Sequence, residues 1–157
     1  MIRLVIFDLD RTLWDGTKLY PDVVKMLEHL RGRNVFIAMA SHNTEAFEIC
    51  QMLKISHYFN IVVGDAHVVR VNTNGAYLGD YIEKTSHLRK IVNWYAGLGV
   101  EFLPDEVLFV DDNKFIIQDV ARQKIKTWHT PHGVTMAGLS EFIPSKNWID
   151  WFFYAFA

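Results

Sequence analysis

The sequence predicts an α/β fold of three layers, in which helices cover both faces of a five-stranded, mainly parallel sheet. Short apolar runs alternate with segments of helical periodicity, which is the order that the right-handed β-α-β crossovers of a Rossmann-like domain produce. Polar residues directly follow several of these runs, at the strand ends where open α/β sheets bind ligands. With 157 residues, half of them hydrophobic, the chain is expected to form one domain over residues 1–157.

Five apolar runs are the expected strands. The first, Leu4–Phe7, is rich in β-branched and aromatic residues, as buried parallel strands are. The others lie at 35–40, 58–64, 107–110 and 126–129. Strand-forming residues on both sides of an Asn-Gly turn at 74–75 predict a short hairpin insertion near 66–79. This insertion is too small to be a large cap domain.

Helices are expected between these strands, where apolar residues recur on one helical face. The first is predicted to start at Pro21, because proline suits the first helical position, and to end near the glycine and asparagine at 32–34. The others are expected at 46–53, from about 83 to 97, and through 116–120.

Composition and charge exclude several classes of protein. A formal net charge of −2 argues against nucleic-acid binding, which needs clustered lysine and arginine. The single cysteine, Cys50, has no disulfide partner and no zinc-site spacing, so we expect a core position in a reducing compartment. Because charges at Arg3 and Asp8 flank the first apolar run, we expect no signal peptide, and no run reaches membrane-spanning length. The expected location is cytoplasmic.

Acidic residues, a hydroxyl group and a lysine stand at the ends of predicted elements. They are Asp8 and Asp10 after the first strand, Ser41 after the second, Lys84 at the start of the helix before the fourth, and Asp111 and Asp112 after the fourth. Carboxylates suit Mg²⁺, a hard cation that pairs readily with substrate phosphate. A lysine and a hydroxyl group suit phosphoryl oxygens. The pattern therefore predicts Mg²⁺-assisted chemistry on a phosphate group.

The same residues resemble the four motifs of the haloacid dehalogenase superfamily of phosphotransferases. The motifs are matched in order by Asp-Leu-Asp-Arg-Thr-Leu-Trp at 8–14, Ser41, Lys84 and Asp111-Asp112. Within the superfamily the chain is most similar to the magnesium-dependent phosphatase 1 family. The shared segments are Leu-Tyr-Pro-acidic-Val at 19–23, Ala-Ser-x-x-x-Glu at 40–45, Lys-x-x-His at 84–87 and Phe-x-Asp-Asp at 109–112. The resemblance covers about residues 2–129.

This resemblance implies a Mg²⁺-dependent hydrolase of phosphoric monoesters that works through an aspartyl-phosphate intermediate. Asp8 is similar to the family's nucleophile, and Asp10 to its general acid and base. Aspartate at this second position favours phosphoester hydrolysis over dehalogenation or ATP-driven pumping. The implied metal ligands are Asp8, the backbone carbonyl of Asp10, Asp112 and, directly or through water, Asp111.

The resemblance also implies a set of groups that hold the phosphate. These are Ser41, Lys84 and the backbone N–H groups of Leu9 and of the residues after Ser41. His42 adjoins this motif and is a candidate substrate contact. Arg11 stands where the closer family has an aromatic residue. Its cation either contacts a negatively charged leaving group or lies in solvent.

Each motif also has a structural interpretation, and the function has alternatives. Ser41 and the stretch 111–113 suit helix caps, and Lys84 suits a solvated helix start. The alternative functions are phosphoryl transfer to an acceptor other than water, and a non-catalytic binding module of the same fold. Because the loops at 14–19 and 65–83 differ in length from the closer family, the substrate stays open between phosphorylated small molecules such as sugars and phosphoproteins, phosphotyrosine included.

The C-terminal tail at 146–157 is aromatic and too short to span a bilayer. We expect it to fold back onto the domain. A homodimer or partner interface is the next alternative, and a membrane anchor is disfavoured because basic residues are scarce beside it.

Overall fold

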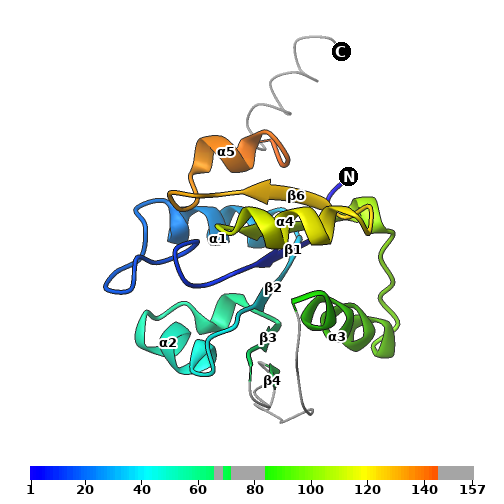
Figure 1. The fold of residues 1–157 in the computed structure, drawn as a ribbon, viewed down its shortest axis with the longest axis horizontal. Helices are drawn as coiled ribbons and strands as arrows, with labels where there is room; N and C mark the ends of the chain where they lie inside the picture. The colour runs from blue at the N-terminus through cyan, green and yellow to red at the C-terminus, as the bar shows by residue number, and fades with distance from the viewer. Residues whose placement is uncertain (66–68, 72–83, 145–157) are drawn as a thin grey trace.

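A computed structural model describes residues 1–65, 69–71 and 84–144 (Figure 1). Within these ranges the strands form one six-stranded sheet in the order β4-β3-β2-β1-β5-β6. The strands are β1 (Leu4–Phe7), β2 (Phe36–Ala40), β3 (Ile61–Val63), β4 (Val69–Val71), β5 (Val107–Asp111) and β6 (Lys126–His129). All neighbouring strands pair in parallel except β3 and β4, which are antiparallel. The predicted parallel sheet of five strands is confirmed, with β4 added at one edge.

The sixth strand comes from the predicted hairpin insertion. β4 corresponds to its first arm and pairs with β3, with Ile61 opposite Val71. The turn and second arm of the predicted hairpin, at 72–79, lie outside the described residues. The aromatic tail at 146–157 also lies outside them, so its docking and its role in a dimer stay predictions.

The predicted helices α1 to α4 connect the strands, with differences at their starts, and α5, which was not predicted, follows β6. They are α1 (Val23–Gly32), α2 (Ala46–Met52), α3 (Lys84–Gly97), α4 (Lys114–Ala121) and α5 (Met136–Ser140), and short 3₁₀ turns cover Ser56–Tyr58 and Pro104–Glu106. The prediction that Pro21 starts the first helix is wrong, because Asp22 is the N-cap of α1 and Pro21 lies in the preceding turn. The Asp22 carboxylate accepts a hydrogen bond of 2.7 Å from the N–H of Met136 and so links the starts of α1 and α5.

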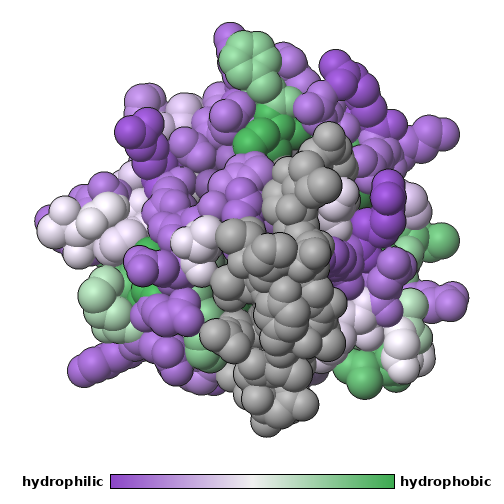
Figure 2. All heavy atoms as spheres, turned by 60° about the horizontal axis from the view of Figure 1, so that its bottom comes forward, coloured by the Kyte–Doolittle hydropathy of each residue, from purple (hydrophilic) through white to green (hydrophobic). Residues whose placement is uncertain are grey.

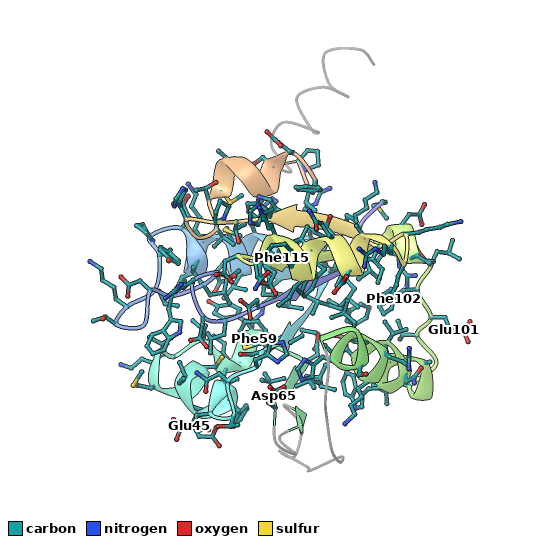
Figure 3. The ribbon with its side chains drawn as sticks, viewed as in Figure 1. Glu45, Phe59, Asp65, Glu101, Phe102 and Phe115 are labelled. Carbon is teal, nitrogen blue, oxygen red and sulfur yellow. The ribbon has the colours of Figure 1, made fainter. Side chains whose placement is uncertain are left out.

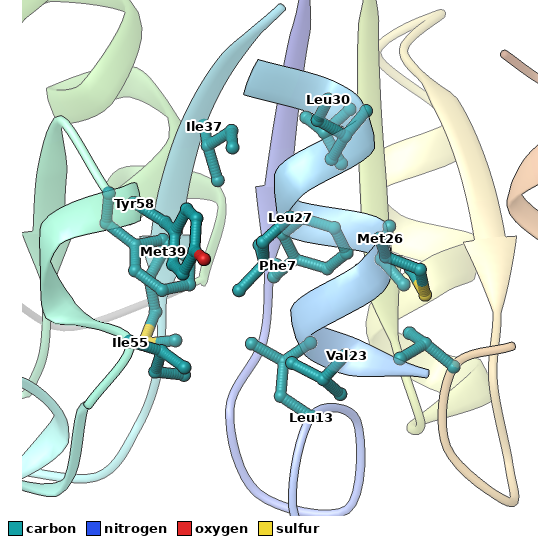
Figure 4. Close-up of a cluster of buried hydrophobic side chains, with 14 of the residues drawn as sticks. Phe7, Leu13, Val23, Met26, Leu27, Leu30, Ile37, Met39, Ile55 and Tyr58 are labelled. Atoms are coloured by element: carbon teal, nitrogen blue, oxygen red, sulfur yellow. The ribbon is translucent and has the colours of Figure 1, made fainter. Parts of the chain in front are cut away.

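Two layers of helices cover opposite faces of the sheet. Because side chains alternate along a strand, Phe7 of β1 packs in the cluster that contains α1, α2 and α5, and its neighbour Ile6 packs in the cluster with α3 and α4. Figure 4 shows the first cluster, with Met26 and Leu27 of α1 lying over Phe7. The predicted three-layer architecture is therefore confirmed. Both faces of the central strands are buried, which explains why these strands are continuous apolar runs in the sequence.

The described surface is mainly polar on the face shown in Figure 2, with hydrophobic side chains in separate spots. None of the helices in the described ranges combines the length and apolar character that a membrane span requires.

Candidate active site

Backbone hydrogen bonds hold three of the predicted site residues at one edge of the sheet. The N–H of Asp8 donates to the carbonyl of Val110 at 2.9 Å, and the N–H of Ser41 donates to the carbonyl of Val63 at 2.9 Å. Asp111 is the last residue of β5. Because β1 lies between β2 and β5, the carboxyl ends of these parallel strands meet at the same edge.

Three carboxylates converge at this edge. Asp8, Asp111 and Asp112 each offer an oxygen, and these oxygens lie within 4.8 Å of one another. Asp8 and Asp111 are buried, with 6% and 1% exposed, and Asp112 is half-buried. Carboxylates this close repel one another unless a cation balances them. Mg²⁺ takes oxygen ligands at about 2.0–2.1 Å, so opposite ligands lie about 4.2 Å apart. The donor set therefore fits the ion predicted from the sequence.

The cap of α4 does not require these carboxylates. Asn113 is the N-cap, and its Oδ1 accepts hydrogen bonds from the N–H groups of Phe115 at 2.9 Å and Ile116 at 3.3 Å. Asp111 Oδ1 accepts the N–H of Asn113 at 3.0 Å. The sequence left open whether the stretch 111–113 caps a helix or binds a metal. In the structure Asn113 caps α4, and the carboxylates of Asp111 and Asp112 lie beside Asp8.

A tight turn after β1 positions the Asp8 side chain. The carbonyl of Leu9 accepts hydrogen bonds from the N–H groups of Thr12 at 3.2 Å and Leu13 at 2.9 Å. The turn buries Thr12, whose Oγ1 donates to Asp8 Oδ2 at 3.1 Å. Arg11 has a left-handed backbone with φ of +61° and an exposed side chain. The motif therefore presents Asp8 inward and Arg11 outward.

Two donors hold the Asp10 carboxylate. Trp14 Nε1 donates to Asp10 Oδ1 at 2.8 Å, and Asn43 Nδ2 donates to Asp10 Oδ2 at 3.2 Å. Each oxygen keeps a second lone pair for another partner. Asp10 is half-exposed, so its carboxyl group is oriented by the protein and accessible to a ligand.

Ser41 is fully buried, and its Oγ accepts the N–H of Asn43 at 3.0 Å. It is not the cap of the following helix, since the N-cap of α2 is Glu45. Lys84 is the first residue of α3. The contact of its amine with phosphate and with Asp8 stays a prediction, because the Lys84 side chain is not among those that the structure describes.

A second polar cluster lies beside Ser41. Asp65, which Figure 3 shows just beyond β3, places Oδ2 2.9 Å from His42 Nδ1 and Oδ1 3.1 Å from His87 Nε2. His87 comes from the first turn of α3 and is fully buried. The His42 side chain is directed to Asp65, so its backbone N–H, directly after Ser41, is the part of this residue suited to phosphate.

Sequence reasoning did not single out Asn43 or Asp65 as site residues. Asp65 directly follows the third predicted strand, the same type of position as Asp8 and Ser41, and this was the available signal. Asn43 gives a weaker signal, because an asparagine two residues after a strand end also suits a turn.

Fold and site together define the class of protein: a haloacid dehalogenase-like phosphatase, with acidic residues after β1 and at the end of β5 and a serine after β2. Residues 15–146 match the family model described as Acid Phosphatase, and the chain belongs to this family. The resemblance read from the motifs is confirmed, and the protein is a phosphatase-type hydrolase.

Individual relatives agree with this assignment. The chain is 26% identical over 164 residues to human magnesium-dependent phosphatase 1, covering 88% of this chain and 84% of the human protein. In structure it is similar to a haloacid dehalogenase-like hydrolase from Streptococcus pneumoniae, with a TM-score of 0.65 and 13% identity over 91% of each chain. It is also similar to the N-terminal part of a Bacteroides fragilis protein, containing a phosphatase domain complexed with Mg, with a TM-score of 0.62 and 17% identity over 92% of this chain and 41% of that one.

Proposed function

We propose that this protein is a Mg²⁺-dependent phosphatase that hydrolyses phosphate monoesters through an aspartyl-phosphate intermediate. The observation that carries the proposal is the convergence of Asp8 with Asp111 and Asp112 at one edge of the sheet. The name of the human relative and the Mg complex of the Bacteroides fragilis domain support magnesium as the ion.

In the first half of the reaction, a carboxylate oxygen of Asp8 attacks phosphorus, and the bond from phosphorus to the ester oxygen breaks. The Thr12 hydroxyl, which donates to Asp8 Oδ2, fixes the rotation of the attacking carboxylate. Asp10, in its protonated form, gives its proton to the departing ester oxygen. The products are the free alcohol and a phosphoryl group on Asp8.

In the second half, Asp10 is a carboxylate and takes a proton from water. The water oxygen attacks phosphorus, the bond from phosphorus to Asp8 breaks, and inorganic phosphate leaves. Asp10 regains its proton and Asp8 its carboxylate, so both groups are ready for the next turnover. The hydrogen bonds from Trp14 and Asn43 support this double role, because they hold Asp10 in one orientation for both transfers.

The phosphoryl oxygens are held by the Ser41 hydroxyl, the Lys84 amine and the backbone N–H groups of Leu9 and His42. Asp8, Asp111, Asp112 and the Asp10 carbonyl would hold Mg²⁺, which when bound offsets the repulsion between the Asp8 carboxylate and the anionic substrate.

The substrate is a phosphorylated small molecule or a phosphoprotein. Arg11 is proposed as a contact for a negatively charged leaving group. Its exposed cation lies on the turn that directly follows Asp10 and ends at Trp14. We also propose that residues 1–157 act as one domain in the cytoplasm, which the free, buried Cys50 supports.

Hydrolysis of p-nitrophenyl phosphate, with and without Mg²⁺, tests the proposal. The wild-type chain should turn over only with the metal, and Asp8→Asn should lose at least about 10³-fold in kcat. Asp119→Asn is the matched control, because Asp119 is exposed on α4 and pairs only with the exposed Arg122 among the described residues. Metal-independent turnover, or full activity in Asp8→Asn, would remove the proposal.

A phosphorylated Asp8 is a separate and more specific readout. Stopping the reaction in acid and mapping the labelled peptide should place the phosphoryl group within the segment that contains Asp8. A label elsewhere, or none during rapid turnover, argues for direct attack by water.

A further inference from the structure

We propose a second metal site, formed by His42, Asp65 and His87 and suited to Zn²⁺ or a similar transition-metal ion. One ring nitrogen of His42, one ring nitrogen of His87 and a carboxylate oxygen of Asp65 lie within 4.8 Å of one another. The three residues come from three elements, since His42 follows β2, Asp65 follows β3 and His87 lies in the first turn of α3. The site is separate from the cluster of Asp8, Asp111 and Asp112 and shares no ligand with it.

The distances match an ion held between the three side chains. Two atoms that are each about 2.0–2.1 Å from one zinc ion lie about 2.9 Å apart at a right angle and about 3.4 Å apart at the tetrahedral angle. The Asp65 oxygens lie 2.9 Å from His42 Nδ1 and 3.1 Å from His87 Nε2. The two imidazole rings are 5.5 Å apart and tilted by 56°, so they are not stacked.

The three side chains of the cluster differ in their exposure to solvent. The side chain of His87 is 0% exposed, that of Asp65 28% and that of His42 46%. Asp65 Oδ1 is a buried oxygen that lies 3.1 Å from His87 Nε2. The cluster therefore has a buried base and an open rim, through which an ion enters and at which water completes its coordination.

The ligand types select the ion. Neutral imidazole nitrogens suit Zn²⁺ and neighbouring transition metals, whereas Mg²⁺ prefers oxygen ligands and keeps its waters. Two histidines with one carboxylate are a known zinc ligand set in enzymes. Mg²⁺ at the acidic cluster and Zn²⁺ at the histidine cluster are therefore expected to bind at the same time.

Binding at this site has a structural consequence. An ion here would link the end of β2, the end of β3 and the start of α3, in addition to the pairing of β2 with β3 and the packing of α3 on the sheet. α3 carries Lys84 three residues before His87, and His42 directly follows Ser41. The site is therefore placed to fix the two residues that are proposed to hold phosphate.

The test is a zinc titration of the metal-depleted full chain by calorimetry in excess Mg²⁺, which keeps the acidic cluster occupied. We expect one equivalent of Zn²⁺ to bind and to raise Tm. His42→Ala and Asp65→Asn should each weaken binding by about 100-fold or more, because each loses a direct ligand. His42→Ala is the safer variant for folding, since this side chain is the most exposed of the three. His57→Ala is the control, because His57 is exposed on the 3₁₀ turn that precedes the amino end of β3, whereas the proposed site lies at the carboxyl ends of the strands.

Cobalt gives an independent readout. Co²⁺ in place of Zn²⁺ should produce visible absorption that His42→Ala removes and that Asp112→Asn and His57→Ala retain. The proposal is overturned if no equivalent binds, if His42→Ala and Asp65→Asn bind like wild type, or if Asp112→Asn abolishes the signal. The last result would place the ion in the acidic cluster.

Discussion

The indole Nε1 of Trp14 donates a hydrogen bond of 2.8 Å to Oδ1 of Asp10, four residues earlier in the chain. The turn after β1 makes this contact possible, because the N–H of Arg11 bonds to the carbonyl of Trp14 and returns the chain beside Asp10. Trp14 is 8% exposed and packs in the core that includes α1, so it has one rigid position. The core thus determines the orientation of the proposed general acid.

Trp14→Phe should lower kcat about 10- to 100-fold, since the ring is largely kept while the donor to Asp10 is lost. We expect KM to change little, because the loss is in the orientation of Asp10 and not in the groups proposed to hold phosphate. Steady-state kinetics measure kcat and KM separately. Trp94→Phe, a half-buried tryptophan on the opposite layer, is the control. Equal losses in the two variants would point to general destabilisation.

Asp112→Asn should raise the Mg²⁺ concentration for half-maximal activity by about tenfold or more, because an amide is a weaker ligand than a carboxylate for a hard cation. Activity at increasing Mg²⁺ measures the effect. Asp105→Asn is the control, since Asp105 is exposed just before β5 and so lies at the other end of the same strand. If Asp112→Asn needs no more Mg²⁺ than the wild type, Asp112 is not a metal ligand, and the proposed ligands are Asp8, Asp111 and the Asp10 carbonyl.

Gly138→Ala should destabilise the protein by about 1–3 kcal/mol through overpacking. A Cβ at this position of α5 would lie 2.4 Å from Trp128 Cζ2 and 3.1 Å from Thr135 Oγ1. Gly97→Ala, at the end of α3, meets no atom within 4 Å and should be neutral or stabilising by about 0.5–1 kcal/mol. Urea unfolding of both variants measures the difference. Similar stabilities would show that α5 moves away from Trp128 at little cost.

The stability of the protein should fall at alkaline pH, partly through Cys50. Burial raises the pKa of this thiol from 9.0 to about 12 in the folded protein. The unfolded chain loses the thiol proton above its own pKa while the native state keeps it, so the contribution is complete below pH 9 and is lost as pH rises. The loss amounts to about 1.4 kcal/mol between pH 8 and pH 10. Urea unfolding should show a shallower decline in Cys50→Ser.

The same burial should make Cys50 unreactive. A thiol reagent at pH 8 should label it only after denaturant is added, because the thiolate is the reactive form. Rapid labelling of the native protein would mean that the helix α2, which carries Cys50, opens readily.

The sequence by itself determined the order of strands and helices and the positions of the acidic motifs. This was possible because β1, β2 and β5 are buried on both faces and therefore require continuous apolar runs, and because polar residues directly after such runs lie at one edge of a parallel sheet. The five parallel strands followed from these local patterns, and the phosphatase class followed from the resemblance of the motifs to a known family.

Only the tertiary structure decided which side chains meet. Asn43 donates a hydrogen bond to Asp10, 33 positions away in the sequence. Asp65, after β3, contacts both His42, after β2, and His87, in α3. The tertiary structure also decided where α1 begins. Asp22, whose carboxylate accepts a hydrogen bond from the N–H of Met136, is the N-cap of α1, and Pro21 lies before it. These contacts depend on the distances and angles between elements that pack together, and residue patterns within one segment do not contain that information.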